Sequence, residues 1–185
     1  MKIGIISDSH GNINALQTAF AKLNDIDQLV HAGDILYHPP RLQDLPDYNF
    51  MESATFLNSL KIPINVCQGN CDSQVYTEIL DFYEERPTVL CCFGKYKAVI
   101  NHGHMLNEMT MISLAKDCNA QIFISGHTHV PALYKKDGVI LLNPGSISIP
   151  RFPNPPDPTA GIIDEKNIKI FGIKSNKIYF EMDIE

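Results

Sequence analysis

The first part of the chain alternates short apolar runs with helix-like segments, and this order constrains the fold more than any other feature. Apolar runs occur at residues 2–7, 28–34 and 62–68. Between them, residues 12–23 place apolar side chains on one helical face, and residues 49–60 are also expected to be helical. A strand–helix–strand–helix–strand order is typical of parallel strands in an α/β fold. We therefore predict parallel strands joined by helices.

The second part of the chain is richer in strands. Its expected elements are strands at 88–93, 97–101 and 121–125, a helix at 108–117, a hairpin at 132–143 and three further strands between 161 and 184. Gly94 separates the first two strands as a hairpin turn, and the Asp137–Gly138 pair favours a second hairpin turn. We expect an α/β fold with two sheets packed together, formed as one domain by residues 1–185.

Composition narrows the function classes. No apolar run approaches the ~20 residues that cross a bilayer, and the start of the chain turns polar too early for a signal peptide. The five cysteines are odd in number and form no CxxC pair, so we expect reduced thiols and a cytoplasmic protein. A net charge of −6 predicts no strong nucleic-acid surface. It does not exclude a phosphate substrate, because bound cations reverse the local field.

Polar side chains recur where the apolar runs end. They are Asp8 and His10, Asp34, Asn70, His102 and His104, and His127 and His129. Each has an ordinary explanation as a turn residue, a helix cap or a surface histidine. Because the carboxyl ends of parallel strands meet at one edge of a sheet, however, these side chains can converge. Coincidence at every strand end is implausible, so we interpret the constellation as one site.

The types of donor indicate a metal site. The candidate ligands are Asp8, His10, Asp34, Asn70, His102, His127 and His129. Carboxylate, amide and imidazole donors without thiolate suit divalent ions with nitrogen and oxygen ligands, and seven candidates exceed what one ion uses. We expect Asp34 to bridge two ions, since a shared anion reduces their repulsion. Such a pair activates a hydroxide for in-line attack on phosphorus without a serine or cysteine nucleophile.

The blocks DSH, GD, GNCD, HGH and GHTH, in this order, resemble the calcineurin-like metallophosphoesterases, and in particular their small bacterial phosphodiesterases, over almost the whole chain. The resemblance implies a four-layer sandwich of two mixed β-sheets flanked by helices, and a phosphoric diester hydrolase with a dinuclear centre. It suggests manganese, while the donor types also permit iron, zinc, nickel or cobalt. One ion would take Asp8, His10, Asp34 and His129, and the other Asp34, Asn70, His102 and His127.

One position departs from the pattern of many relatives, which have a histidine where this chain has Cys71. That histidine is thought to protonate the leaving oxygen, and a thiol is a poor match to an alkoxide. We interpret Cys71 as a small packing residue. His104 is the predicted catalytic acid or phosphate contact, with a hydrogen bond that orients a ligand as the alternative. Weak proton donation would favour substrates with acidic leaving groups.

Three residues near the ligands are predicted to contact the substrate: Asn12, His38 and Arg41. Arg41 lies in a proline-rich loop and could pair with a phosphate oxygen, although a solvated arginine is an equal alternative. Asn12 could instead cap the helix that follows it. The expected partner of the protein is a small phosphate ester.

A different class of function stays open. The retromer subunit of this fold has lost part of the ligand set and uses the scaffold for protein contacts, so a non-catalytic metal-binding scaffold is the alternative. Here His10, Asp34 and Asn70 are all present, which favours the enzyme. The last strands could also offer an edge to a second copy of the chain, which would give a homo-oligomer.

Overall fold

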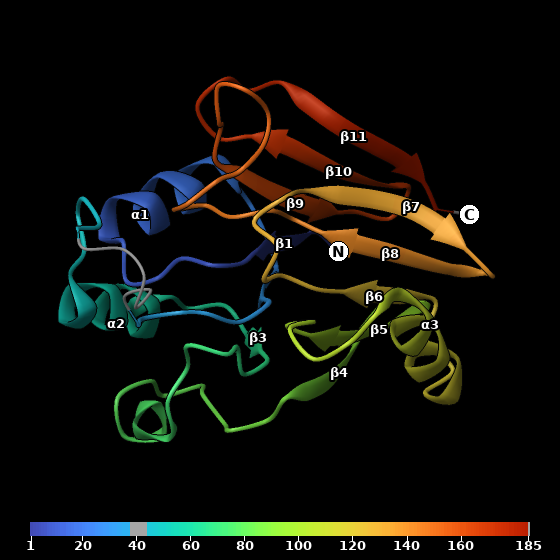
Figure 1. Ribbon diagram of the computed structural model, residues 1–185, viewed down its shortest axis with the longest axis horizontal. Coiled ribbons are helices and arrows are strands. Elements are labelled where there is room, and N and C mark those ends of the chain that lie inside the picture. Colours follow the sequence, from blue (N-terminus) through green and yellow to red (C-terminus); the bar gives the residue numbers. More distant parts are fainter. Residues whose placement is uncertain (38–43, 185) are drawn as a thin grey trace.

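The structure of this 185-residue chain is a computed structural model that describes residues 1–37 and 44–184 (Figure 1). The helices are α1 (Ile13–Lys22), α2 (Phe50–Ser59), α3 (Glu108–Asp117) and a short 3₁₀ helix, η1 (Gln74–Glu78). The strands are β1 (Ile3–Ile6), β2 (Gln28–His31), β3 (Ile64–Val66), β4 (Thr88–Phe93), β5 (Tyr96–Asn101), β6 (Ile122–Ile124), β7 (Ala132–Lys136), β8 (Val139–Asn143), β9 (Thr159–Ile163), β10 (Asn167–Gly172) and β11 (Ile178–Asp183).

The first sheet has six strands in the order β11-β10-β9-β1-β2-β3. β1 and β2 are parallel, as are β2 and β3, so the predicted parallel strands joined by helices are confirmed. β9 runs antiparallel to β1 and begins the meander β9-β10-β11. The carboxyl ends of β1, β2 and β3 therefore lie side by side.

The second sheet has five strands in the order β4-β5-β6-β8-β7. β5, β6 and β8 are parallel neighbours, and the hairpins β4-β5 and β7-β8 are antiparallel. Both hairpin turns predicted from Gly94 and Asp137–Gly138 are confirmed. The 3₁₀ helix η1 was not predicted from the sequence.

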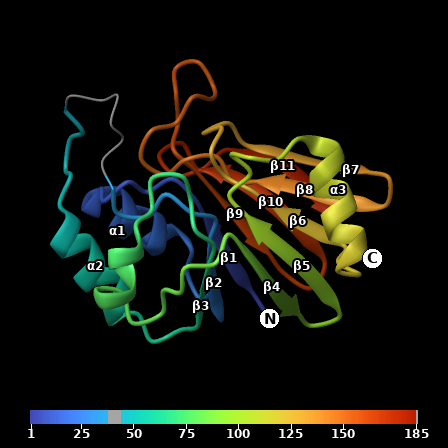
Figure 2. The ribbon, with the colours of Figure 1, turned by 60° about the horizontal axis from the view of Figure 1, so that its bottom comes forward.

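Alternation of side chains along the strands explains the layers. Ile5 of β1 and Ile124 of β6 point into a buried cluster between the two sheets. On the outer faces, Leu16 of α1 and Leu57 of α2 pack against the first sheet, and α3 packs against Phe123 of the second. Figures 1 and 2 show the result: α1 and α2 beside one sheet and α3 beside the other. The predicted four-layer sandwich of two mixed sheets is confirmed.

An asparagine directly precedes each of the three α-helices in the described residues. The side-chain oxygens of Asn12, Asn49 and Asn107 each accept a hydrogen bond from the backbone N–H three residues later. This N-cap satisfies one of the N–H groups that have no partner inside the helix. None of the helices in the described residues has the length and apolar character needed to cross a membrane.

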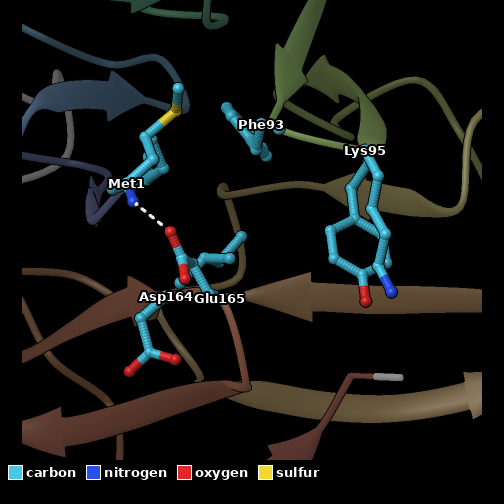
Figure 3. A pocket seen from close by; sticks show the side chains of 9 residues that line it. Met1, Phe93, Lys95, Asp164 and Glu165 are labelled. Atoms are coloured by element: carbon cyan, nitrogen blue, oxygen red, sulfur yellow. Dashed lines mark hydrogen bonds and ion pairs between the residues drawn. The ribbon is translucent and has the colours of Figure 1, made fainter.

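A pocket of about 290 Å³ opens at the amino-terminal end of β1, between the β4-β5 turn and the β9-β10 turn (Figure 3). Its walls include Ile3, Phe93 and Tyr96, and the amino group of Met1 bonds to Glu165 at its rim at 3.0 Å. The residues that follow the carboxyl end of β1 lie at the other end of the strand. The pocket is therefore separate from the predicted ligands.

Candidate metal centre

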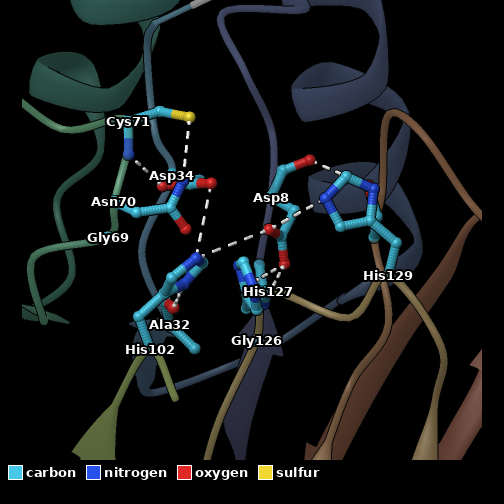
Figure 4. Close-up of polar contacts among 12 residues, drawn as sticks. Asp8, Ala32, Asp34, Gly69, Asn70, Cys71, His102, Gly126, His127 and His129 are labelled. Carbon is cyan, nitrogen blue, oxygen red and sulfur yellow. Dashed lines mark hydrogen bonds and ion pairs between the residues drawn. The ribbon is translucent and has the colours of Figure 1, made fainter. Parts of the chain in front are cut away.

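The predicted ligands gather where the parallel strands of both sheets end (Figure 4). Asp8 and Asp34 follow β1 and β2 of the first sheet, whereas His102 and His127 follow β5 and β6 of the second. From the sequence, we predicted that the donors meet at the edge of one sheet. The structure instead brings together the strand ends of two sheets, because the sheets pack face to face.

The centre of the cluster is buried. His129 Nε2 lies 3.2 Å from Asp8 Oδ1, and His102 Nε2 lies 3.3 Å from Asp34 Oδ2. His10 Nε2 lies 3.8 Å from Asp34 Oδ2 and 4.0 Å from Asp8 Oδ1. Asp8, His10 and His129 offer donor atoms within 4.8 Å of one another, and so do Asp8, Asp34 and His102. These are distances at which a cation can join the donors.

Several of these donor atoms have no partner in the described residues. Asp8 Oδ1, His10 Nε2 and His102 Nε2 are buried and accept or donate no hydrogen bond there. The Nδ1 atoms of His10, His102 and His129 each face a backbone carbonyl oxygen at 2.6–3.0 Å. A carbonyl only accepts, so Nδ1 carries a proton, and in the neutral ring Nε2 presents a lone pair. Buried lone pairs facing carboxylates fit a divalent cation.

The backbone is strained at the same place. Asp8, His10, Asp34, His127 and His129 have φ angles of 48–67°, in the left-handed region. A residue with a side chain pays about 1–2 kcal/mol there. Backbone hydrogen bonds between the loops after β1 and β2 hold two of these residues, with N···O distances of 3.1 Å. Ten non-glycine residues of the described chain have positive φ, all of them Asp, Asn or His, and five of these ten are candidate ligands.

Asn70, His127 and His104 lie at the exposed mouth of the cluster. The ring centroid of His127 is 5.4 Å from that of His102 and 6.1 Å from that of His104. Asn70 donates from its amide to Cys71 Sγ at 3.2 Å. The structure therefore brings these predicted residues next to the buried donors, in contact with solvent.

His102 and Asp34 shift each other's pKa. Burial lowers the pKa of His102, but the carboxylate of Asp34, 3.3 Å from Nε2, and the charge of Asp8 raise it to about 9. Burial raises the pKa of Asp34, but His102 outweighs it, and the pKa of Asp34 falls well below its usual range. For His10 burial is the largest effect and lowers the pKa. A proton and a metal ion would therefore compete for Nε2 of His102.

Cys71 lies beside the cluster. Its backbone N–H donates to Asp34 Oδ1 at 2.8 Å, and its thiol falls within 4.8 Å of donor atoms of His10 and Asp34. Burial and the charge of Asp34 raise the pKa of the thiol to about 12. The thiol is therefore protonated at neutral pH, which does not suit a nucleophile.

One supporting residue was missed in the sequence. The carboxylate of Asp72 accepts backbone N–H bonds from Asp34, Ile35 and Gly69 at 2.7–2.8 Å. It ties the loop after β2 to the loop after β3. The sequence did contain an indication of this role, because Asp72 is the acidic residue of the GNCD block and was not assigned as a metal ligand.

Of the three residues predicted to contact the substrate, only Asn12 lies in the described part of the chain. The Asn12 oxygen accepts from Ala15 N at 2.8 Å, and its amide nitrogen donates to Pro46 O at 3.0 Å. Its side chain therefore caps the start of α1, which was the alternative interpretation of Asn12, and it also bonds to the neighbouring loop. His38 and Arg41 lie outside the described residues.

The sequence is similar to those of known phosphoesterases. Residues 1–167 match the family model of the calcineurin-like phosphoesterase superfamily domain. The chain is 29% identical to phosphodiesterase YfcE of Escherichia coli K12 over 188 aligned residues, covering 100% of this chain and 98% of YfcE. It is 31% identical to the probable metallophosphoesterase YsnB of Bacillus subtilis over 157 residues, covering 82% of this chain and 78% of YsnB.

The solved structures agree with the sequence relatives. The structure of E. coli YfcE, described as a phosphoesterase, has a TM-score of 0.86 and 25% identity and covers 100% of both chains. Vps29 of Entamoeba histolytica in complex with zinc has a TM-score of 0.71 and 18% identity and covers 99% of both chains. The second likeness shows the fold alone.

Proposed function

The chain belongs to the calcineurin-like phosphoesterase superfamily, and from this premise we propose that it is a metal-dependent phosphodiesterase. One observation carries the proposal. Buried donor atoms of Asp8, His10 and His102 converge without hydrogen-bond partners in the described residues, although each of these side chains is otherwise held. A protein leaves buried polar atoms unpaired at a cost of about 1–3 kcal/mol each, which a bound cation removes.

The donor set fits two divalent ions. We propose that one ion is held by Asp8, His10, Asp34 and His129, and the other by Asp34, Asn70, His102 and His127. Nitrogen and oxygen donors suit manganese and also permit iron, zinc, nickel or cobalt. When bound, the ions supply positive charge to the phosphoryl oxygens and lower the pKa of water.

The chain itself supplies geometry. Backbone carbonyls fix the rings of His10, His102 and His129, so the lone pairs are aimed before any ligand arrives. His104, at the mouth and 5.5 Å from the His102 ring, is positioned to donate a hydrogen bond to the phosphate or the leaving oxygen. No serine or cysteine nucleophile is required, since water is the nucleophile.

The substrate class and the compartment follow from the same features. A phosphate ester is the electrophile that a site of this kind suits, and the proposed substrate is a small diester. All five cysteines lie in the described residues and are free, which fits a reducing compartment. We place the protein in the cytoplasm.

Asp34→Asn tests the proposal. Asparagine keeps an oxygen for the Cys71 N–H but removes the shared negative charge. Manganese-loaded wild type should hydrolyse an aryl phosphodiester faster than the matching monoester. The variant should lose activity by about 100-fold or more and bind less manganese. Asp137→Asn, in the exposed β7-β8 turn, is the matched control and should behave as wild type.

Two results would count against the proposal. Full activity of Asp34→Asn would refute its bridging role. A wild type that is inert towards diesters with every metal would favour a non-catalytic scaffold, the alternative function, since Vps29 shares the fold.

A further inference from the structure

A buried serine–histidine pair lies beneath the candidate metal centre. Ser9 stands between Asp8 and His10, and His31 is the last residue of β2. Ser9 Oγ lies 2.8 Å from His31 Nε2 and 2.7 Å from the carbonyl oxygen of Ile35. Ser9 and His31 are 0% and 1% exposed, so neither reaches a substrate. Any function of the pair is exerted through its neighbours.

The protons of the pair can be assigned from its partners. The carbonyl of Ile35 only accepts, so the single hydroxyl proton of Ser9 goes to it. The Ser9 oxygen therefore accepts from His31 Nε2–H. His31 Nδ1 is buried and has no hydrogen-bond partner within residues 1–37 and 44–184. It is the nitrogen without a proton, since a buried N–H without an acceptor costs more.

The pair connects the loop that follows β1 to β2. Asp8 and His10 have φ angles of 54° and 48°, so the loop between them is not in a preferred conformation. Backbone bonds from Asp8 N to Gly33 O and from His10 N to Asp34 O hold it at both sides of Ser9. The Ser9 hydroxyl is the side-chain link at the middle of the loop, joined to the end of β2 on one side and to Ile35 on the other.

We propose that His31, acting through Ser9, is a positioning residue that fixes the Asp8–His10 loop against the Asp34 loop and so sets the affinity for one metal ion. The metal part of this inference rests on the proposed function. The structural part, an Nε2–H imidazole that holds the loop, does not depend on any metal.

Manganese titration calorimetry tests the metal part. Ser9→Ala removes both hydrogen bonds, and His31→Phe removes the donor but keeps a ring. Each should weaken binding of one ion by about 10–100-fold. His31→Gln offers an amide N–H near the position of Nε2 and should recover most of the affinity. Ser53→Ala is the matched control, because Ser53 is a buried serine of α2 whose hydroxyl has no partner in the described residues.

Nitrogen-15 spectra of the metal-free wild type test the structural part. They should show His31 with a protonated Nε2 and a bare Nδ1, and Ser9→Ala should shift the amide signals of Asp8 and His10. Unchanged manganese affinity in folded Ser9→Ala, or a proton on Nδ1, would overturn the inference. If wild type binds no manganese, the proposed function fails, and the nitrogen spectra still decide the role of His31.

Discussion

At the scale of single residues, the imidazoles of the cluster are oriented by the nitrogen that does not face the metal site. His10, His102 and His129 each donate Nδ1–H to a backbone carbonyl. Such a bond fixes both the tautomer and the plane of the ring. The donors are therefore arranged before a metal binds, and little reorganisation remains for the binding step.

The thiol of Cys71 leads to a prediction about the leaving group of the substrate. A protonated thiol with a raised pKa is a poor general acid for an alkoxide. We expect wild type to hydrolyse an aryl diester, whose leaving group needs no proton, much faster than an alkyl diester. Cys71→His should narrow this ratio, since general acid catalysis contributes about 10²–10⁴-fold. Rates with a series of diesters of increasing leaving-group pKa provide the measurement.

The dependence of the rate on leaving-group pKa distinguishes a loss of proton donation from a loss of folded protein. Cys71→Ser, which keeps a small side chain without an acidic or basic group, should leave the slope as in wild type. Equal rates of wild type on aryl and alkyl diesters would show that proton donation is already efficient, and that Cys71 does not limit it.

At the scale of elements, the loop after β6 must approach β1 closely. A Cβ on Gly126 would overlap the Ser7 hydroxyl and lie 2.9 Å from Asp8 Oδ2. Gly126→Ala should therefore lower the free energy of unfolding by about 1–3 kcal/mol and weaken manganese binding through Asp8. Gly161→Ala of β9 is the matched control, because its Cβ would meet Ile5 at an ordinary 3.4 Å. Equal stabilities of the two variants, measured by urea unfolding, would contradict the packing argument.

The start of α1 gives a second prediction at this scale. Asn12 caps the helix, so Asn12→Ala should lower the free energy of unfolding by about 1 kcal/mol, and Asn12→Asp should restore most of it. KM for the diester should stay within about twofold of wild type, since the side chain is occupied locally. A KM that rises several-fold with unchanged stability would return Asn12 to the substrate site.

At the scale of the whole molecule, the candidate metal centre lies where the two sheets meet. Its donors follow β1 and β2 on one side and β5 and β6 on the other, so a bound ion opposes separation of the sheets. Manganese at about 100 times its Kd should stabilise the protein by about 2.7 kcal/mol. This corresponds to a rise in Tm of about 5–10 °C, which a chelator should reverse.

The stabilisation should depend on pH. His102 has a pKa of about 9 without metal, so at neutral pH the metal must displace its proton. Affinity therefore rises with pH below that value, by up to about tenfold per unit for one proton. The manganese-dependent rise in Tm should be larger at about pH 8 than at about pH 6. A rise in Tm that is independent of pH would show that His102 is neutral in the metal-free protein.

Sequence reasoning succeeded where the signal was local. The apolar runs that became β1, β2 and β3, and the hairpin turn at Asp137–Gly138, depend on a few adjacent residues. It did not find η1, the role of Asp72 or the Ser9–His31 pair. Those depend on contacts between segments that are distant in the chain, such as the contact between Ser9 and His31, whose residue numbers differ by 22.

The order of strands and helices and the kinds of donor atom at the strand ends could be predicted from the sequence. These follow from side-chain periodicity and ligand chemistry, which each residue carries with it. The packing of the chain was needed to show that the donors come from two sheets, that Nε2 of His10 and of His102 has no hydrogen-bond partner in the described residues, and that five candidate ligands adopt positive φ. The reason is physical: these features depend on the packing of the sheets and on long-range hydrogen bonds, which no local pattern encodes.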